Sequence, residues 1–232
     1  MPVLELLSSS GLGALLGMRH ALEPDHLAAV STLLTGERSG AKAALLGVCW
    51  GLGHTCSLIV IGTALVLLRA EIPEWVADGF ECGVALMLIG LGLRAIYLAA
   101  QRGVAGPAHL HQHGQTVHEH PGIAPHVHIG TWTLARGPLL IGAMHGLAGS
   151  GALTTLVVAA LPSTAARISY LALFGLGSTL SMAALSGLLG WPLARFGRNR
   201  RLARVLSLAV GCGSTVLGLG WGYPVLARLL GS

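Results

Sequence analysis

Long apolar stretches separated by short polar segments dominate the hydrophobic pattern of this chain. A helix that crosses the hydrocarbon core of a bilayer needs about 20 apolar residues. By that criterion the pattern predicts six spanning helices, with approximate bounds 3–34, 43–68, 76–99, 138–161, 166–191 and 204–227. The first stretch is too long for one straight span, so we expect it to break near Pro24. The predicted fold is therefore all-α, a polytopic membrane protein.

Composition agrees with this class. Of the 232 residues, 53% are hydrophobic and only 10% are charged, whereas soluble domains carry about 25% charged residues. The formal net charge is +5, but the bases form neither a folded basic domain nor an aromatic-basic recognition motif, so we expect no nucleic-acid partner.

The lysines and arginines outside the predicted spans indicate the orientation. One side of the membrane holds ten of them: Arg38, Lys42, Arg94, Arg102, Arg136, Arg195, Arg198, Arg200, Arg201 and Arg204. The other side holds Arg69, Arg167 and Arg228. Because cytoplasmic loops are enriched in Lys and Arg, the side with ten bases should be cytoplasmic. We therefore expect a multi-pass protein of the cell (inner) membrane with both termini external.

The two halves of the chain resemble each other. Three segments recur in order at offsets of 125, 124 and 128 residues: His20 with His145, Gly51-Leu52-Gly53 with Gly175-Leu176-Gly177, and Gly90 with Gly218. The alternative is that Gly and Leu simply recur in any membrane helix. Each half holds three predicted spans, and this odd number turns the second half upside down in the membrane. Many secondary transporters are inverted repeats of this kind.

This interpretation divides the chain into three parts. Residues 1–100 would form the first three-helix repeat, residues 138–232 the second, and residues 101–137 a cytoplasmic loop between them. In such transporters the substrate site lies near the bilayer midplane, between the repeats.

Four of the eleven histidines lie inside predicted spans, where ionisable side chains usually face a polar pathway. On an unbroken helix, His20 and His26 would point about 240° apart, so both can face one ion only if the helix breaks at Pro24. Imidazole combined with carboxylate is a ligand set for divalent transition metals. We therefore predict a metal site composed of His20, Asp25, His26, His54 and His145.

Structural roles are open for several of these residues. Asp25 also suits the N-cap of a helix over residues 26–34, and one residue could be both cap and ligand. His54 and His145 could each make only a helix–helix hydrogen bond. Glu23 either forms a structural pair with Arg19, one turn back, or relays a proton.

A second group of histidines lies in the loop, interleaved with other residues and flanked by prolines. It consists of His109, His111, His113, His118, His120, His126 and His128. This composition is typical of a flexible, weak metal-binding tract. We predict an auxiliary role in gathering, delivering or sensing metal.

The motif His20-x-x-x-x-Asp25-His26 resembles the H-x-x-x-x-D-H signature of the nickel/cobalt transporter family. Leu52-Gly53-His54-Thr55 looks like the next motif of that family, L-G-H-S/T. The chain is especially similar to the short, urease-accessory-like nickel permease members. The resemblance implies a nickel or cobalt permease in which His20, Asp25, His26 and His54 are needed for transport. In the later half, the motif around His145 lacks the acidic residues that family members carry there.

We therefore expect secondary transport of Ni²⁺ or Co²⁺ across the plasma membrane. The nitrogen-rich, thiol-free donor set also suits Zn²⁺. We expect no permanently bound cofactor and no enzymatic activity. The expected partners are the lipid bilayer, the metal ion and a cytoplasmic metallochaperone or nickel-enzyme maturation system.

Other functions fit the pattern less well. A metal efflux permease is one alternative. An exporter of small anions or amino acids on a related scaffold would explain the repeat but not the histidines in the spans. A membrane thiol-redox enzyme would require cysteines in the first and fourth spans, which have none, and a zinc hydrolase would carry H-E-x-x-H, which is absent.

Overall fold

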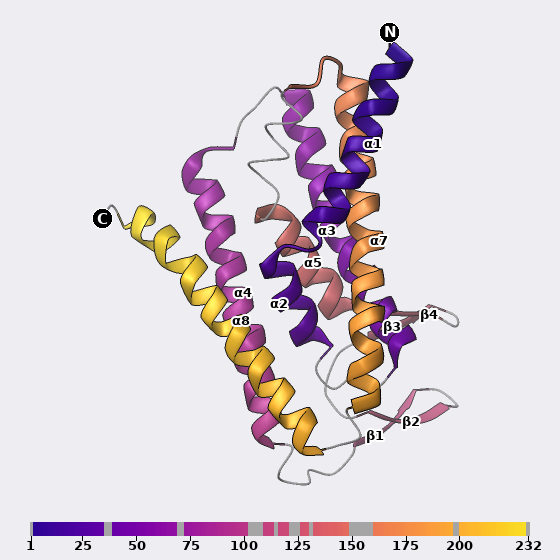
Figure 1. The fold of residues 1–232 in the computed structure, drawn as a ribbon, viewed down its shortest axis with the longest axis vertical. Coiled ribbons are helices and arrows are strands. Elements are labelled where there is room, and N and C mark those ends of the chain that lie inside the picture. The colour runs from indigo at the N-terminus through magenta and orange to yellow at the C-terminus, as the bar shows by residue number, and fades with distance from the viewer. Residues whose placement is uncertain are drawn as a thin grey trace.

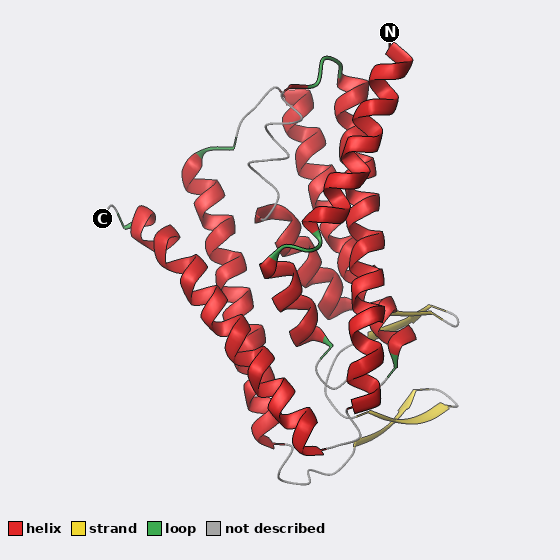
Figure 2. Ribbon diagram, viewed as in Figure 1, coloured by secondary structure: helices red, strands yellow, loops and turns green. Residues whose placement is uncertain are grey.

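The computed structural model describes residues 2–34, 39–68, 72–101, 109–113, 116–120, 126–129, 132–148, 160–196 and 200–230. The helices of these ranges are α1 (Pro2–His20), α2 (Pro24–Leu33), α3 (Gly40–Leu68), α4 (Glu74–Gln101), α5 (Arg136–Ala148), α7 (Thr164–Phe196) and α8 (Arg200–Leu229). The strands are β1 (His109–His113), β2 (Thr116–His120), β3 (His126–Ile129) and β4 (Trp132–Ala135). Figure 2 shows that the strands are confined to the segment between α4 and α5.

The long helices pack in two groups (Figure 1). In the first group α3 packs against α7 and α5, and α1 packs against α7. In the second group α4 packs along α8. The short helix α2 contacts both α4 and α8, and α5 contacts α4, so these two short helices lie between the groups.

Polar contacts support the pairing of α4 with α8. Arg228, near the end of α8, donates to Asp78 at 2.7 Å and to Glu81 at 3.2 Å from the start of α4. Farther along, the buried Ser214 hydroxyl donates to the backbone carbonyl of Leu88 at 2.9 Å.

Four of the described helices are long and apolar enough to cross a membrane: Gly40–Leu68, Glu74–Gln101, Thr164–Trp191 and Arg201–Leu229. They correspond to the predicted second, third, fifth and sixth spans. Large apolar side chains are exposed along the helices, as expected for surfaces in contact with lipid: Leu15, Val60, Leu86, Leu176 and Val216 are examples. The chain is therefore a helical, multi-pass membrane protein.

The other two predicted spans do not appear as single long helices. The first is divided between α1 and α2, as its length and Pro24 suggested. The fourth begins in α5, and its continuation over residues 149–159 lies outside the described ranges.

The break between α1 and α2 occupies residues 21–23. Pro24 takes the first position of α2, where its missing N–H leaves no hydrogen bond unmade and its fixed φ suits a helix start. The N-cap is Glu23, with an extended backbone (φ −64°, ψ 148°), and its side chain makes no capping bond. The expectation that Asp25 is the N-cap is therefore wrong, because Pro24 starts the helix earlier and places Asp25 in its first turn.

Glycines allow helix backbones to touch at several crossings. A Cβ atom added at Gly17 of α1 would overlap the backbone carbonyl of Phe174 in α7, and one at Gly142 of α5 would overlap that of Trp50 in α3. Small residues at such crossings bring membrane helices close enough for van der Waals packing, which drives their association in lipid.

The histidine-rich segment is more regular than expected. Strands β1 and β2 pair as one antiparallel hairpin, and β3 and β4 pair as another. The prediction of an entirely α-helical fold is therefore wrong for these residues, whereas the flexibility of the tract stays a prediction. The alternation His-x-His-x-His has the period of two that favours a strand. The strands were not predicted because the segment was interpreted by its composition alone.

We expect Gly17→Ala to destabilise the protein by about 1–3 kcal/mol, because the new methyl group forces α1 away from the Phe174 backbone. The matched control is Gly11→Ala on the same helix, where no atom of another described element lies within 4 Å of the added Cβ. The control should gain up to about 1 kcal/mol from helix propensity. Thermal unfolding in detergent compares the two variants, and a rise in Tm for both would refute the close crossing.

Candidate metal centre

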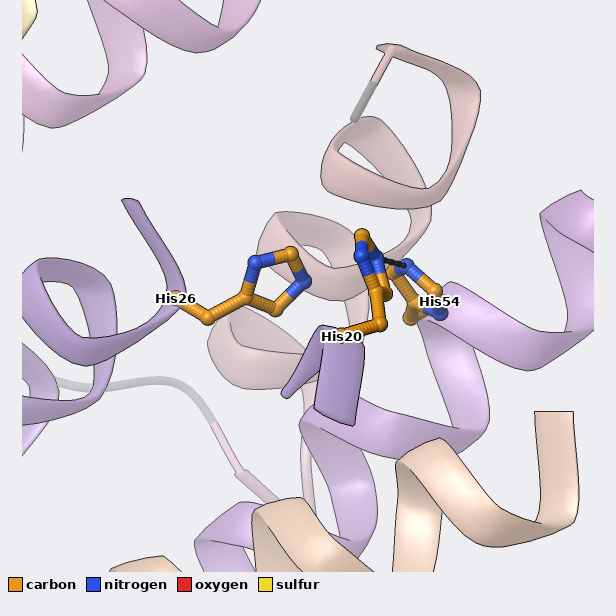
Figure 3. A group of neighbouring side chains, drawn as sticks. All are labelled: His20, His26 and His54. Carbon is orange, nitrogen blue, oxygen red and sulfur yellow. Dashed lines mark hydrogen bonds between the residues drawn. The ribbon is translucent and has the colours of Figure 1, made fainter. Parts of the chain in front are cut away.

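The break after α1 brings two histidines of the same predicted span together. The ring centroids of His20, at the end of α1, and His26, in α2, lie 4.3 Å apart. His54 approaches from α3, and its Nε2 lies 3.2 Å from Nε2 of His20. Figure 3 shows these two rings side by side, with the ring of His26 directed toward them. All three side chains are buried.

One nitrogen–nitrogen distance in this group matches the spacing of two ligands on one metal ion. One ligand atom from each of His20, His26 and His54 can be chosen so that all three lie within 4.8 Å of one another. Two nitrogens that are each about 2.1 Å from an ion are separated by about 3.0–3.4 Å in octahedral or tetrahedral geometry. The 3.2 Å between His20 and His54 falls in that interval. Three imidazoles from three helices could therefore hold one ion.

Glu23 orients the ring of His20. Its Oε2 lies 2.9 Å from Nδ1 of His20. A carboxylate only accepts hydrogen bonds, so this contact holds the proton of the neutral ring on Nδ1 and leaves the lone pair of Nε2 facing His54. The turn over residues 21–23 directs Glu23 back to His20, so the expected pair with Arg19 is not among the ion pairs of the described residues.

Asp25 connects two more histidines. Its Oδ1 accepts from the backbone N–H of His26 at 2.9 Å and from Nδ1 of the same residue at 3.1 Å. Its Oδ2 accepts from Nε2 of His145, in α5, at 2.8 Å. Both carboxylate oxygens are thus engaged by hydrogen-bond donors of the protein. The carboxylate is only 1% exposed, so these donors replace the water it has lost.

Several buried nitrogens lack a partner. Among the described residues, His26 Nε2, His54 Nδ1 and His145 Nδ1 have no hydrogen-bond partner. Buried polar atoms in folded proteins are nearly always paired, so an unpaired set at one place calls for an explanation. Of these three, the Nε2 atom of His26 is available as a metal ligand in the group with His20 and His54.

Aromatic rings line the cluster. The ring of His26 lies 5.4 Å from that of Trp50, and the ring of His20 lies 5.3 Å from that of Phe174, measured between centroids. Sequence reasoning missed both aromatic residues. A signal was available, since each directly precedes its copy of the repeated Gly-Leu-Gly segment.

All five residues of the predicted metal site come together in the structure. His20, His26 and His54 form one group, and Asp25, His26 and His145 form a second group that shares His26. The seven other histidines lie on β1, β2 and β3, which Figure 1 shows in the lower half of the picture, whereas both chain ends lie in its upper half.

Comparison with known proteins gives one match over nearly the whole chain. The chain is 32% identical over 224 residues to the urease accessory protein UreH of Bacillus sp. (strain TB-90), covering 96% of this chain and 94% of that protein. It is 29% identical to the Arabidopsis thaliana chloroplast proteins FOR GROWTH AND FERTILITY 1 and 2, over 79% and 80% of this chain. Those matches span only about half of the two plant proteins, 50% and 48%.

No protein-family model and no solved structure matches the chain. The match to UreH is long enough and close enough to establish common descent, and the motifs around His20 and His54 fall within it. The chain therefore belongs to the family of the urease accessory protein UreH, a nickel/cobalt transporter-like family.

Proposed function

We propose that this protein is a secondary transporter that carries Ni²⁺ or Co²⁺ across the cell membrane, with His20, His26 and His54 as the ligands of the ion in transit. The observation that carries the proposal is the meeting of three buried imidazoles at a broken helix, with ligand atoms within 4.8 Å of one another. Non-helical backbone is tolerated at membrane depth only where protein or a water-filled path surrounds it. A break lined by metal ligands therefore suits a substrate site.

The position of His54 supports a site deep in the membrane. It is the central residue of the helix Gly40–Leu68, with 14 residues on either side. At about 1.5 Å per residue, each end of that helix lies about 21 Å away. Ionisable groups at that depth are costly, and in membrane proteins they mark substrate or ion pathways.

The chemistry of the site and the relative's name together favour nickel as the cargo. Nitrogen donors without thiolate suit Ni²⁺ and Co²⁺, and they also bind Zn²⁺. UreH is named as a urease accessory protein, which favours inward transport of nickel over efflux and suggests delivery to a nickel-enzyme maturation system or metallochaperone.

We further infer that residues 1–100 and 138–232 are inverted repeats, joined by residues 101–137. Reciprocal contacts support this inference. Gly17 packs on Phe174, and Gly142, its counterpart at an offset of 125, packs on Trp50, the counterpart of Phe174 at an offset of 124. Counterparts also meet each other, since the hydroxyls of Thr55 and Thr179 lie 2.8 Å apart. A two-fold relation between the halves makes every contact reciprocal and brings counterparts together next to its axis.

The third helix of each half follows the same rule with a different offset. Gly92 of α4 packs against Gly211 and Thr215 of α8, and Gly218 of α8 packs against Ala85 and Ile89 of α4. Gly92 and Gly218 are 126 residues apart, as are Ala85 and Gly211, and Ile89 and Thr215, so the two sets of contacts are equivalent. Matching glycines in the sequence had given an offset of 128 for these helices. Figure 1 shows the hairpins in the lower half of the picture and both chain ends in the upper half, which agrees with external termini and a cytoplasmic histidine-rich segment.

In this arrangement Asp25 is a positioning residue. Its Oδ1 holds His26 in the orientation that frees Nε2. Its Oδ2 connects the first half of the chain to His145 in the second. Carboxylates that orient ligand histidines in this way typically contribute 10–100-fold to metal affinity.

We expect His20→Ala, His26→Ala and His54→Ala to reduce Ni²⁺ flux at least about tenfold, because each removes one of three ligands. Radiotracer flux of Ni²⁺, Co²⁺ and Zn²⁺ in sealed proteoliposomes measures the effect and the metal preference. Cys56→Ala is the matched control, since Cys56 is exposed on the same helix two residues from His54. Flux that survives all three histidine substitutions would contradict the proposal.

Asp25→Asn should weaken Ni²⁺ binding about 10–100-fold without abolishing it, because the amide keeps one acceptor where the carboxylate had two. Calorimetric titration of the purified protein in detergent measures the affinity. Glu23→Gln is the comparison, since glutamine still offers His20 an acceptor and should change the affinity less. Unchanged affinity in Asp25→Asn would remove Asp25 from the site.

A further inference from the structure

The hairpin of β1 and β2 places histidines directly opposite one another. Its register pairs His109 with His120 and His111 with His118. Residues that face each other across an antiparallel pair share a face of the sheet, and residues two apart along a strand share it as well. These four positions, together with His113, therefore lie on one face of the hairpin.

The second hairpin differs in this respect. Strand β3 also carries two histidines, but the register places His126 opposite Ala135 and His128 opposite Thr133. Two hairpins of similar length thus lie side by side in the sequence, and only the first has histidine pairs across its strands.

Cross-strand histidine pairs have the spacing that a metal ion needs. Directly opposed residues have Cβ atoms about 4.5–5.5 Å apart, whereas diagonal neighbours are about 7–8 Å apart. Two imidazoles at the shorter spacing are suited to bind one ion as a chelating pair. The acidic residue of this hairpin, Glu119, is opposite Leu110 and so occupies the other face. The donor set of the histidine face is therefore nitrogen alone, which suits Ni²⁺, Cu²⁺ and Zn²⁺.

We propose that the histidine face of the β1–β2 hairpin is a second binding site for a divalent transition metal, built from the cross-strand pairs His109/His120 and His111/His118. The site is separate from the buried centre, because Figure 1 shows the β1–β2 hairpin below the lower end of α7, away from the break between α1 and α2. It binds metal whether or not the protein transports it.

Metal binding at this site also orders the hairpin. A two-stranded hairpin by itself is at best marginally stable in water, so its strands open readily. An ion held by one residue from each strand fixes their register, and its binding free energy becomes stability of the hairpin. Addition of Ni²⁺ should therefore slow amide hydrogen exchange in β1 and β2 and leave β3 and β4 unchanged.

The register itself can be tested with variants that remove equal numbers of histidines. His109→Ala/His120→Ala removes one whole pair and keeps the other, whereas His109→Ala/His118→Ala breaks both pairs. The whole chain in detergent, carrying His20→Ala, His26→Ala and His54→Ala to silence both buried groups, is titrated with Ni²⁺ by calorimetry. We expect the variant with both pairs broken to lose on the order of tenfold more affinity than the variant with one pair intact.

The second hairpin supplies the control. His126→Ala/His128→Ala removes two histidines that have no histidine opposite, so it should leave Ni²⁺ affinity within about twofold. Equal losses of Ni²⁺ affinity in all three double variants would show that affinity depends on the number of histidines and not on their pairing across the strands. That result would overturn the proposal. Exchange in β1 and β2 that does not respond to Ni²⁺ would also overturn it.

Discussion

The centre depends on the buried carboxylate of Asp25, which accepts hydrogen bonds from two histidines. A buried carboxylate requires donors, and here they come from His26 in the same short helix and from His145 in α5. Those bonds fix the ring of His26, whose free nitrogen then faces His20 and His54. The break over residues 21–23 allows His26 to face His20, because a continuous helix would place the two rings on different faces. The helix break and the hydrogen bonds of Asp25 are thus both needed to bring the candidate ligands together.

The features predicted correctly from sequence are those with local causes. Pro24 marks the break because a proline ends the helix that precedes it and suits the first position of the next. The long apolar helices follow from composition and length. Contacts between distant segments were harder to predict. Glu23 and Asp25 both suit several roles by residue type, and only the turn over residues 21–23 and the approach of α5 decide that they hold His20, His26 and His145. The hairpins were missed because composition was given more weight than the period of two.

Close glycine crossings connect the architecture to the centre. Gly17 and Gly142 bring α1 and α5 against the backbones of Phe174 and Trp50, whose rings line the histidine cluster. Gly17 and Gly142 are 125 residues apart, and Trp50 and Phe174 are 124 residues apart. The same helix contact therefore occurs once in each direction between the two halves of the chain. The candidate ligands do not follow this relation, since His20, His26 and His54 all come from the first half and the second half adds His145, which reaches the cluster through Asp25.

The central claim is that His20, His26 and His54 hold a single ion. Anomalous X-ray diffraction at the nickel edge, from crystals of the Ni²⁺-loaded protein, tests it most directly. We predict one strong peak about 2.1 Å from a ring nitrogen of each of the three histidines. Nickel found only outside this cluster, with the three rings still in contact with one another, would contradict it.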